Sequence, residues 1–560
     1  MEALEVRSLL STFTVTNLLD SGTGSLRAAI LDANATPGAD LIGFAHNLHG
    51  TITLASGEPA ISGSLTIDGP GANKLSVSGN DASRIFDISG SASVSIAGLT
   101  ITEGLATSGG GILLEGSAAL SISNCTLTDN EAIGSLTGSL TVPDGFGGGI
   151  EDNSSGALTV TDSTFDTNKA IARGPNAPPP AAHGFIIALG GAIDVSFYST
   201  GLATISNSTF TGNQALGGVA GASAGGGALS DSSLVFGATA NMTVTGCTLS
   251  GNAAIGAAGG DGVINYGSGQ AGGINNFASL IVRNSTLTGN LALGSPLAPG
   301  VVPSQGVLSG SSVAGGGIFC LTNNIPATMI VVDSTLAGNQ AVGGAGAAGS
   351  AGSVGEGGGI SVVAGSSARV TGCTLADNVA RGGAGGSGGV GAPGVSGGVD
   401  IGFFASVTVS NTTLINNQAI GGAGGSGAKG GDGVGGGINV GTGVIVGFSP
   451  DPCSLTLTES TFVANLAVGG AGGSGSNGGD GSGGGLSVLV GSSAAIDATW
   501  IVADAALGGC AGTGGASGQG IGGGLYIDTG AVVTLSKSSK VLFNFASTSD
   551  DDIFGVYKTS

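Results

Sequence analysis

Two acidic residues, Glu151 and Asp194, occupy the same position in successive sequence repeats, directly after the tetrapeptides GGGI and GGAI. If each repeat forms one coil of a parallel β-structure, neighbouring strands lie about 4.8 Å apart and the two carboxyl groups become neighbours. Carboxyl groups at that spacing raise one pKa of the pair and suit acid–base catalysis or cation binding. The segment between them carries Arg173 and His183, which are plausible partners for an acidic sugar. These four residues are the candidate catalytic set if the protein is an enzyme.

A non-catalytic surface explains the same pair better than a catalytic site does. Charged residues make up 9% of the chain, so two carboxylates on an outward face are expected for solvation alone. The chain has 13 Lys and Arg residues, too few to line a groove for a polyuronate. We therefore assign no catalytic residue at this stage.

Threonines form a second candidate site. A Thr recurs at one position of each repeat, from Thr126 to Thr499, and alternation places it on the outer face of a sheet. A flat Thr array is a candidate for binding ice or crystalline polysaccharide, although β-propensity and Thr–Thr stacking explain such a column equally well. The candidate binding residues are Thr164, Thr209, Thr248, Thr286, Thr335, Thr374, Thr413 and Thr461.

A GGDG motif recurs at Asp261, Asp432 and Asp480. The last two fall in adjacent repeats, where Ca²⁺ could bridge their carboxylates together with backbone carbonyls. A Gly-rich solvated loop explains the motif as well, so Ca²⁺ is a weak candidate and no other cofactor is predicted.

Two cassettes that alternate along the chain must position all these residues. The first has the form small–Thr–Leu/Phe–x–x–Asn–x–Ala, and the second is GGGI or a close variant of it. Internal repetition at periods of 20–50 residues indicates a solenoid. The first cassette is aligned on Asn130, Asn168, Asn213, Asn252, Asn290, Asn339, Asn378, Asn417 and Asn465.

Each repeat is predicted to be one coil of an all-β, right-handed parallel β-helix with about 13–14 turns. Residues 357–378 contain three short strand-like pieces with alternating apolar residues, and the Gly-rich remainder is expected to be a long excursion loop. The aligned Asn residues are expected to stack as a ladder of side-chain amides. Residues such as Asn124 and Asp162 precede the Thr strand at a bend, where types that tolerate positive φ are favoured.

The cysteines fit a structural role. Cys125, Cys247 and Cys373 take the inward slot of the first cassette, three repeats apart and therefore about 14 Å from one another. A disulfide needs Cα atoms within about 7 Å, so these should be buried thiols. The sequence does not indicate a pairing for Cys320, Cys453 and Cys510.

Four segments are expected along the chain. Residues 1–12 form a flexible leader associated with export, 13–103 an N-terminal cap with irregular first turns, 104–545 the regular repeats, and 546–560 an end or tail. Ser25 is a suitable N-cap for a helix over Ser25–Asn34, with Leu26 and Ile30 on its apolar face. Such a helix would cover one open end of the solenoid.

Composition excludes several classes of protein. The 560 residues include 116 Gly and 15 Pro, with 41% hydrophobic residues. Few charges and many helix breakers exclude a helical enzyme, a coiled coil and a charge-rich disordered chain. A net charge of −22 argues against binding to nucleic acid. No apolar run of 18 residues is present, so no transmembrane helix is predicted.

The paired GGAI/GGGI and TFxxN/TLxxN motifs resemble the GGAI and FxxN repeats of β-helix proteins similar to polymorphic outer-membrane proteins. FTVTNLLDSGTGSLRAAILDAN (Phe13–Asn34) is similar to the CSLREA-like opening of bacterial surface proteins, and LEVRSLLS (Leu4–Ser11) to a planctomycete export-associated motif. The resemblance implies an extracellular or cell-surface protein, often adhesive. Members that are autotransported end in an outer-membrane barrel, and no segment after Phe545 matches one.

These observations lead to three functional hypotheses. The first is an exported scaffold or adhesive protein that contacts an extracellular glycan or a neighbouring cell-surface component. The alternative is a polysaccharide lyase or glycoside hydrolase of the β-helix type, acting through Glu151 and Asp194. The third is binding of ice or crystalline polysaccharide through the Thr array.

Overall fold

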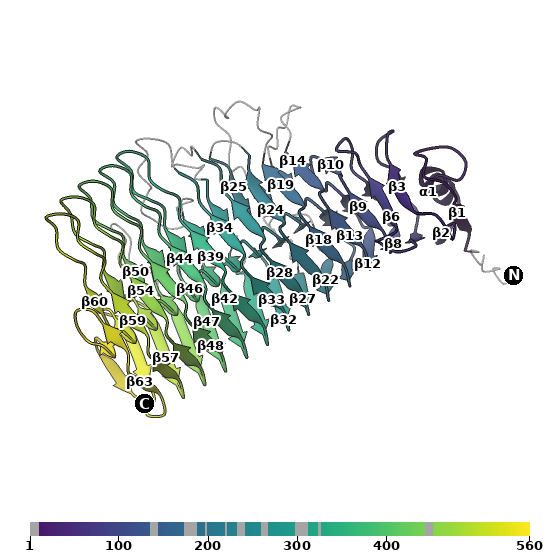
Figure 1. Ribbon diagram of the computed structural model, residues 1–560. Helices are drawn as coiled ribbons and strands as arrows, with labels where there is room; N and C mark the ends of the chain where they lie inside the picture. Colours follow the sequence, from purple (N-terminus) through teal and green to yellow (C-terminus); the bar gives the residue numbers. More distant parts are fainter. Residues whose placement is uncertain are drawn as a thin grey trace.

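The chain folds into a stack of parallel coils along one axis (Figure 1). The computed structural model describes residues 10–134, 144–172, 187–196, 199–218, 221–231, 241–258, 267–296, 312–322, 326–442 and 452–560. Among the described residues, strands of successive coils pair in parallel, and each sheet collects one strand from each successive coil. The predicted parallel β-helix is confirmed, with sheets of up to 16 strands.

Each regular coil has five short strands, two more than the sequence indicated. In one coil these are β42 (Ser367–Thr371), β43 (Thr374–Ala376), β44 (Val379–Arg381), β45 (Gly394–Val395) and β46 (Val399–Ile401). We number the sheets to which they belong 1 to 5 in this order; they hold 16, 14, 12, 10 and 14 strands. The two additional strands, in sheets 3 and 4, are short and rich in Ala and Gly, so they carry no apolar alternation that a sequence pattern can detect.

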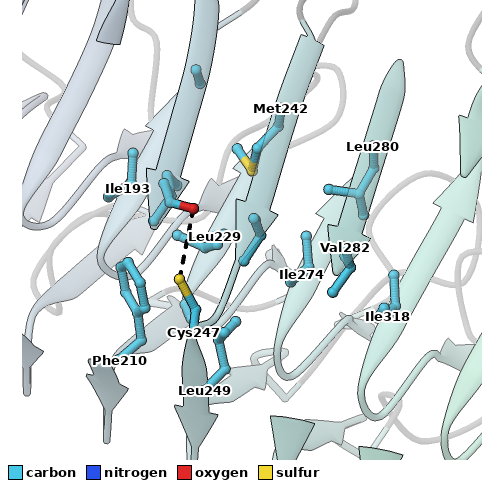
Figure 2. Packing of buried hydrophobic residues seen from close by; sticks show 14 of the residues in the cluster. Ile193, Phe210, Leu229, Met242, Cys247, Leu249, Ile274, Leu280, Val282 and Ile318 are labelled. Atoms are coloured by element: carbon cyan, nitrogen blue, oxygen red, sulfur yellow. Dashed lines mark hydrogen bonds between the residues drawn. The ribbon is translucent and has the colours of Figure 1, made fainter. Parts of the chain in front are cut away.

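Sheets 1, 2 and 5 supply the residues of the main core. In β17 (Leu158–Thr161) the Leu158 and Val160 side chains are buried, and β18 (Thr164–Asp166) buries Phe165 between two more exposed residues. Phe165 stacks on Phe210 of the next coil with ring centroids 4.8 Å apart. Figure 2 shows the same packing further along the stack, where Phe210, Leu249 and Cys247 lie beside residues of sheets 1 and 5.

The bend between sheets 1 and 2 follows the prediction. Asn124, Asp162, Asn207, Asn284, Asp333 and Asn411 all have positive φ near 50°, and Gly246 and Gly372 take the same place in their coils. The next residue points inward, and its hydroxyl accepts from the backbone N–H of the preceding coil, as Ser163 does from Cys125. Cys125, Cys247 and Cys373 occupy this inward position in their coils as buried thiols.

The predicted asparagine ladder runs through the bend between sheets 2 and 3. Each amide nitrogen donates to the Oδ1 atom of the next Asn, for example Asn290 Nδ2 to Asn339 Oδ1 at 2.8 Å and Asn339 Nδ2 to Asn378 Oδ1 at 3.0 Å. The nine residues are fully buried. The ladder continues past the predicted series to Asp504 and Asn544.

Sheets 3 and 4 form a thin lobe beside the main core. Its interior consists of small residues, including Ala170, Ala215 and Ala254 from sheet 3 and Ala188 and Ala224 from sheet 4. In the last coils a Gly-rich hairpin joins the two sheets, over residues 343–353, 382–393, 421–432, 469–480 and 508–519. These segments lie outside the core, as expected, but they are ordered rather than irregular, because successive hairpins hydrogen-bond through their backbones. Figure 1 shows them projecting in register along the green and yellow part of the chain.

The two ends of the stack differ. Helix α1 (Leu26–Ala35) packs on the first coils through Leu26, Ala29, Ile30 and Ala33, and the Ser25 side chain accepts from the Ala28 N–H, as the predicted N-cap requires. At the other end, β65 (Ile553–Phe554) and β66 (Tyr557–Thr559) add last strands to sheets 5 and 1. Within the part of the chain that the structure describes, no helix is long and apolar enough to cross a membrane.

Candidate acidic site

The candidate site lies on sheet 5, at the first position after each GGGI-type turn. Strand register places Glu151 of β16 (Ile150–Ser154) opposite Asp194 of β21 (Ile193–Val195) in the next coil. The sequence therefore identified a true pair of neighbours. The residues at this position in successive coils form a column along the stack, which we call a file. They are Leu113, Glu151, Asp194, Ser230, Asn275, Phe319, Ser361, Asp400, Asn439, Ser487 and Tyr526.

This file points away from the main core, yet its polar members are buried rather than solvated. Glu151 is 2% exposed and Asp194 is 0% exposed. The cause is the three-glycine turn, whose first residue has φ near +60° and folds sheet 4 back over sheet 5. A Cβ atom on Gly225 of sheet 4 would lie 2.9 Å from Asn275 Nδ2, which shows how closely the two files approach. We call this region the junction of sheets 4 and 5.

Glu151 and Asp194 share a hydrogen bond between their carboxyl groups. Burial is the main cause that raises the Glu151 pKa well above its ordinary value, and the charge of Asp194 raises it further. The Ser196 side chain hydrogen-bonds to Glu151 and opposes this shift. One proton between two close carboxyl groups relieves their repulsion, so the raised Glu151 pKa favours a shared proton over two charges.

Two further carboxyl groups lie next to this pair on the core side of sheet 5. Asp152 and Asp231 occupy the same inward position of sheet 5 in two different coils. Val195 occupies that position in the coil between them. Burial raises the pKa of Asp152 to about 6, and the Ser154 N–H and hydroxyl donate to its Oδ1 atom. Burial and the charge of Asp194 raise the pKa of Asp231, and neither of its carboxylate oxygens has a hydrogen-bond partner. Sequence reasoning missed both residues, although a polar residue at an inward strand position was the available signal.

The next two coils of the junction carry more buried polar atoms without partners. They are Ser230 Oγ and both amide atoms of Asn275, and each residue is fully buried. The Glu151 Oε2 atom is also without a partner. Buried polar groups are nearly always hydrogen-bonded, so a cluster of exceptions within a few coils indicates a place for water or a ligand.

The other predicted catalytic residues, Arg173 and His183, lie outside the described residues. Asp261 of the first GGDG motif does so too.

Asp432 and Asp480, the weak Ca²⁺ candidates, lie beside a basic side chain of the same chain. Lys429 lies between them, with its Nζ atom 3.1 Å from Asp432 Oδ1 and 3.0 Å from Asp480 Oδ2. The Asp480 N–H also donates to Asp432 Oδ1. An ammonium group therefore bridges the two carboxylates and balances part of their charge. Among the described residues, no three His, Cys, Asp or Glu side chains group as a metal site.

The threonine column is confirmed as a continuous file on the outer face of sheet 2, with one correction. Register aligns Thr126 and Thr164 with the rest of the predicted binding residues, Thr209, Thr248, Thr286, Thr335, Thr374, Thr413 and Thr461. Thr100 extends the file at its start. Thr499 does not belong to it, because Trp500 pairs with Thr461 and Thr499 turns inward as the hydroxyl partner of Ser460.

The solved structures to which this chain is distantly similar include glycan-acting enzymes. No family model and no curated protein matches the chain. Among solved structures, the catalytic unit of an α-1,3-glucanase from Streptomyces thermodiastaticus is similar at 12% identity, over 97% of this chain and 70% of that one, with a TM-score of 0.31. A mannuronic acid-specific family 6 lyase from human gut microbiota matches at 10% identity over 87% of both chains, with a TM-score of 0.31. A mannuronan C-5 epimerase module from Azotobacter vinelandii matches at 10% identity over 93% and 99%, with a TM-score of 0.25. Similarity at this level assigns no activity to the chain.

Proposed function

We propose that this protein is a glycan-acting enzyme whose acid–base pair is Glu151 and Asp194. One observation carries the proposal: two buried carboxyl groups from successive coils lie side by side, and burial together with the charge of Asp194 raises the Glu151 pKa well above its ordinary value. Ionisable groups with strongly raised pKa values concentrate at functional sites. A protonated carboxyl group is the form that donates a proton to the leaving oxygen when a glycosidic bond breaks.

The surroundings of the pair favour a polyhydroxylated substrate. Ser230 Oγ and the Asn275 amide present a hydroxyl, a carbonyl and an N–H group that have no protein partner. Sugar hydroxyls both donate and accept, so they satisfy all three groups.

The location and partner follow from the same proposal. A polymeric glycan is an extracellular substrate, in line with the export-associated motif at Leu4–Ser11 and with the resemblance to bacterial surface β-helix proteins. Membership of that group stays a prediction.

The test is depolymerisation of a panel of neutral and acidic polysaccharides by the full chain, with products measured as new reducing ends and by mass spectrometry. We expect activity on at least one polymer, and a fall of about 100-fold or more in Glu151→Gln and Asp194→Asn, as for loss of a general acid or base. Asp432→Asn, which removes a carboxylate paired with Lys429, is the control and should keep the full rate.

Stability measurements separate loss of chemistry from loss of fold. Glu151→Gln removes a buried ionisable group that repels Asp194, so its melting temperature should equal or exceed that of the wild type. Equal rates for the wild type and both amide variants, or no product from any polymer, would refute the proposal.

A second candidate function is a surface scaffold or adhesive module that binds a crystalline glycan or ice. The observation in its favour is the Thr file of sheet 2, which runs without a break from β9 (Thr100–Thr102) to β53 (Thr461–Val463). Co-sedimentation with crystalline cellulose, chitin and ice tests it, with Thr209→Lys and Thr248→Lys placed in the file. Thr456→Lys, on the exposed face of sheet 1, is the matched control. Binding that survives the file variants would exclude this surface.

A further inference from the structure

A second pair of carboxyl groups lies at the junction of sheets 4 and 5, several coils beyond Glu151. Glu356 belongs to β40 (Gly355–Glu356) of sheet 4, and Asp400 belongs to β46 of sheet 5 in the next coil. The turn at Gly357, with φ of +60°, brings Glu356 back over sheet 5. Burial first, and then the charge of Asp400, raises the pKa of Glu356 to about 8. Burial raises the pKa of Asp400 to about 7.

Hydroxyl and amide groups lie around this pair, and the hydroxyl groups stand farther from the carboxylates than in a normal hydrogen bond. The Ser312 hydroxyl lies 3.4 Å from Glu356 Oε1, and the Ser361 hydroxyl lies 3.4 Å from Asp400 Oδ2. Both distances exceed the 2.7–2.8 Å that is usual for O–H···O hydrogen bonds by about 0.6 Å. The two carboxylates are therefore only loosely satisfied by these hydroxyl groups.

The Asn439 side chain adds an unpaired oxygen to the same place. Its Nδ2 atom donates to Asp400 Oδ1 at 3.0 Å and to the Gly441 carbonyl at 2.8 Å, so the amide is held against the Asp400 carboxylate. Its Oδ1 atom is buried without a partner, and the residue is 1% exposed. Ser487, next in the file and fully buried, leaves its Oγ atom without a partner as well.

No cation of the described protein balances this pair. Neither Glu356 nor Asp400 takes part in an ion pair among the described residues, whereas Asp432 and Asp480 both pair with Lys429. Asp400 is 3% exposed and Glu356 is partly buried, and two such carboxylates side by side favour either a shared proton or a bound cation. An unpaired oxygen atom in the adjacent coil favours the cation, because a proton shared by the two carboxyl groups would leave Asn439 Oδ1 without a partner.

We propose that Glu356 and Asp400, together with the Asn439 side-chain oxygen and the neighbouring Ser hydroxyl groups, bind a hard divalent cation, with Ca²⁺ as the best match. The donors are all oxygen atoms, which suit Ca²⁺ and Mg²⁺ rather than Zn²⁺ or Cu²⁺. Ca²⁺ accepts irregular sets of six to eight oxygen ligands, whereas Mg²⁺ demands a near-octahedral set. With only two carboxylates, the affinity belongs in the range of extracellular modules, a Kd of about 10⁻⁴ to 10⁻³ M. This site is independent of the proposed glycan chemistry at Glu151.

The experiment is a Ca²⁺ titration of the full chain after treatment with EDTA, followed by the melting temperature and by equilibrium dialysis. We expect the melting temperature to rise as Ca²⁺ reaches about 1–10 mM, and dialysis at these concentrations to find one bound ion per chain that Mg²⁺ displaces poorly. Glu356→Gln and Asp400→Asn should each weaken this binding at least tenfold. Asp432→Asn is the control and should bind as the wild type does.

Other results would overturn the proposal. A melting temperature that does not respond to Ca²⁺, or responds equally in the wild type and in Glu356→Gln and Asp400→Asn, excludes a cation at this place. A melting temperature that does not respond to Ca²⁺ but rises on acidification more in the wild type than in Glu356→Gln and Asp400→Asn shows that the pair shares a proton instead. Circular dichroism of both variants in EDTA establishes that they are folded. Glycan depolymerisation is measured separately in the same variants, so failure of one proposal leaves the other intact.

Discussion

Asp504 interrupts the asparagine ladder with a residue that has the same shape but cannot donate when ionised. Its Oδ1 atom accepts from the N–H and the amide of Asn465, as an Asn side chain would. Its Oδ2 atom takes the place of the amide nitrogen, which in the equivalent Asn465 donates to the Leu414 carbonyl. That Oδ2 atom is buried without a partner, and burial raises the pKa of Asp504 to about 7. The proton of the neutral form supplies the missing donor.

The first prediction follows from that pKa. The folded value of about 7 lies above the ordinary value of 3.8, so the folded protein binds the proton between these pH values and the unfolded chain does not. The contribution of Asp504 to stability is therefore fully present below pH 3.8 and is lost as the pH rises through about 7. Asp504→Asn restores the donor at every pH, and should raise stability by at least about 1 kcal/mol at pH 8.

Thermal unfolding of the wild type and Asp504→Asn at several pH values between 4 and 8 measures this effect. The difference between the two proteins should be small at pH 4 and largest at pH 8. Other buried carboxyl groups contribute equally to both curves, so parallel curves would contradict the assignment.

At the residue scale, the sequence predicted which residues are neighbours in successive coils better than it predicted their burial. The position after the GGGI-type turn identified Glu151 and Asp194 as neighbours, because register in a solenoid follows directly from repeat alignment. Their burial was not predictable, since it depends on sheet 4, whose two-residue strands have no sequence period. Glu356 was missed for the same reason: it stands in sheet 4, at a position where other coils carry residues as different as Gln270, Val395 and Ser482.

At the scale of elements, the Gly-rich hairpins show why these segments contain so little else. A Cβ atom on Gly425 would overlap the carbonyl oxygen of Gly386 in the preceding coil, and Gly473 has the same relation to Gly425. The Gly425 N–H donates to the Gly389 carbonyl, so each hairpin bonds to the preceding one through its backbone. Close backbone contact, rather than loop flexibility, explains the composition.

The second prediction concerns this contact. Gly425→Ala places a methyl group against the rigid backbone of the neighbouring hairpin, and should destabilise the protein by about 1–3 kcal/mol, as overpacking usually does. Ser426→Ala, at the exposed tip beside it, is the matched control and should change stability by less than about 0.5 kcal/mol. Chemical denaturation compares the two. Equal stability of both variants would mean that the hairpins separate easily.

Sequence patterns recognised these hairpins only as segments without apolar alternation. Alternation reports side chains that pack, whereas the hairpins pack through backbone atoms, so the pattern correctly excluded them from the core but gave no sign of their order. The cassettes, in contrast, contain the alternating apolar residues, the bends and the ladder, and these features were predicted residue by residue.

At the scale of the whole molecule, one end of the stack is covered and the other is open. Helix α1 buries Leu26 and Ile30 against the first coils. At the opposite end, Phe543 and Val556 are each 84% exposed, and all three residues of β66 are exposed. Because coils of a solenoid contact only their neighbours, local stability depends on the nearest end.

The third prediction is a gradient of hydrogen exchange along the axis. Backbone amides of β66 should exchange first, those of β2 (Asp40–Phe44) later, and those of β47 (Ser406–Ser410), which pairs on both sides, last. Ile30→Ala should speed exchange in β2 without affecting β57 (Ser493–Asp497), many coils away. Mass spectrometry of peptides resolves these regions. Uniform exchange along the chain would show that the stack opens as a single cooperative unit.

The hairpins over 382–393 and 421–432 are equal in length, so the chain between equivalent points of the two hairpins is one complete repeating unit. Residues 379–417 contain one strand for each sheet, one hairpin and one rung of the ladder, and both their boundaries lie next to an equivalent Asn. A tandem duplication of this segment meets compatible surfaces above and below, and would lengthen the rod by about 4.8 Å. Evolution by unequal crossing-over, or a protein engineer, can therefore adjust the reach of this molecule in fixed increments without redesigning either terminus.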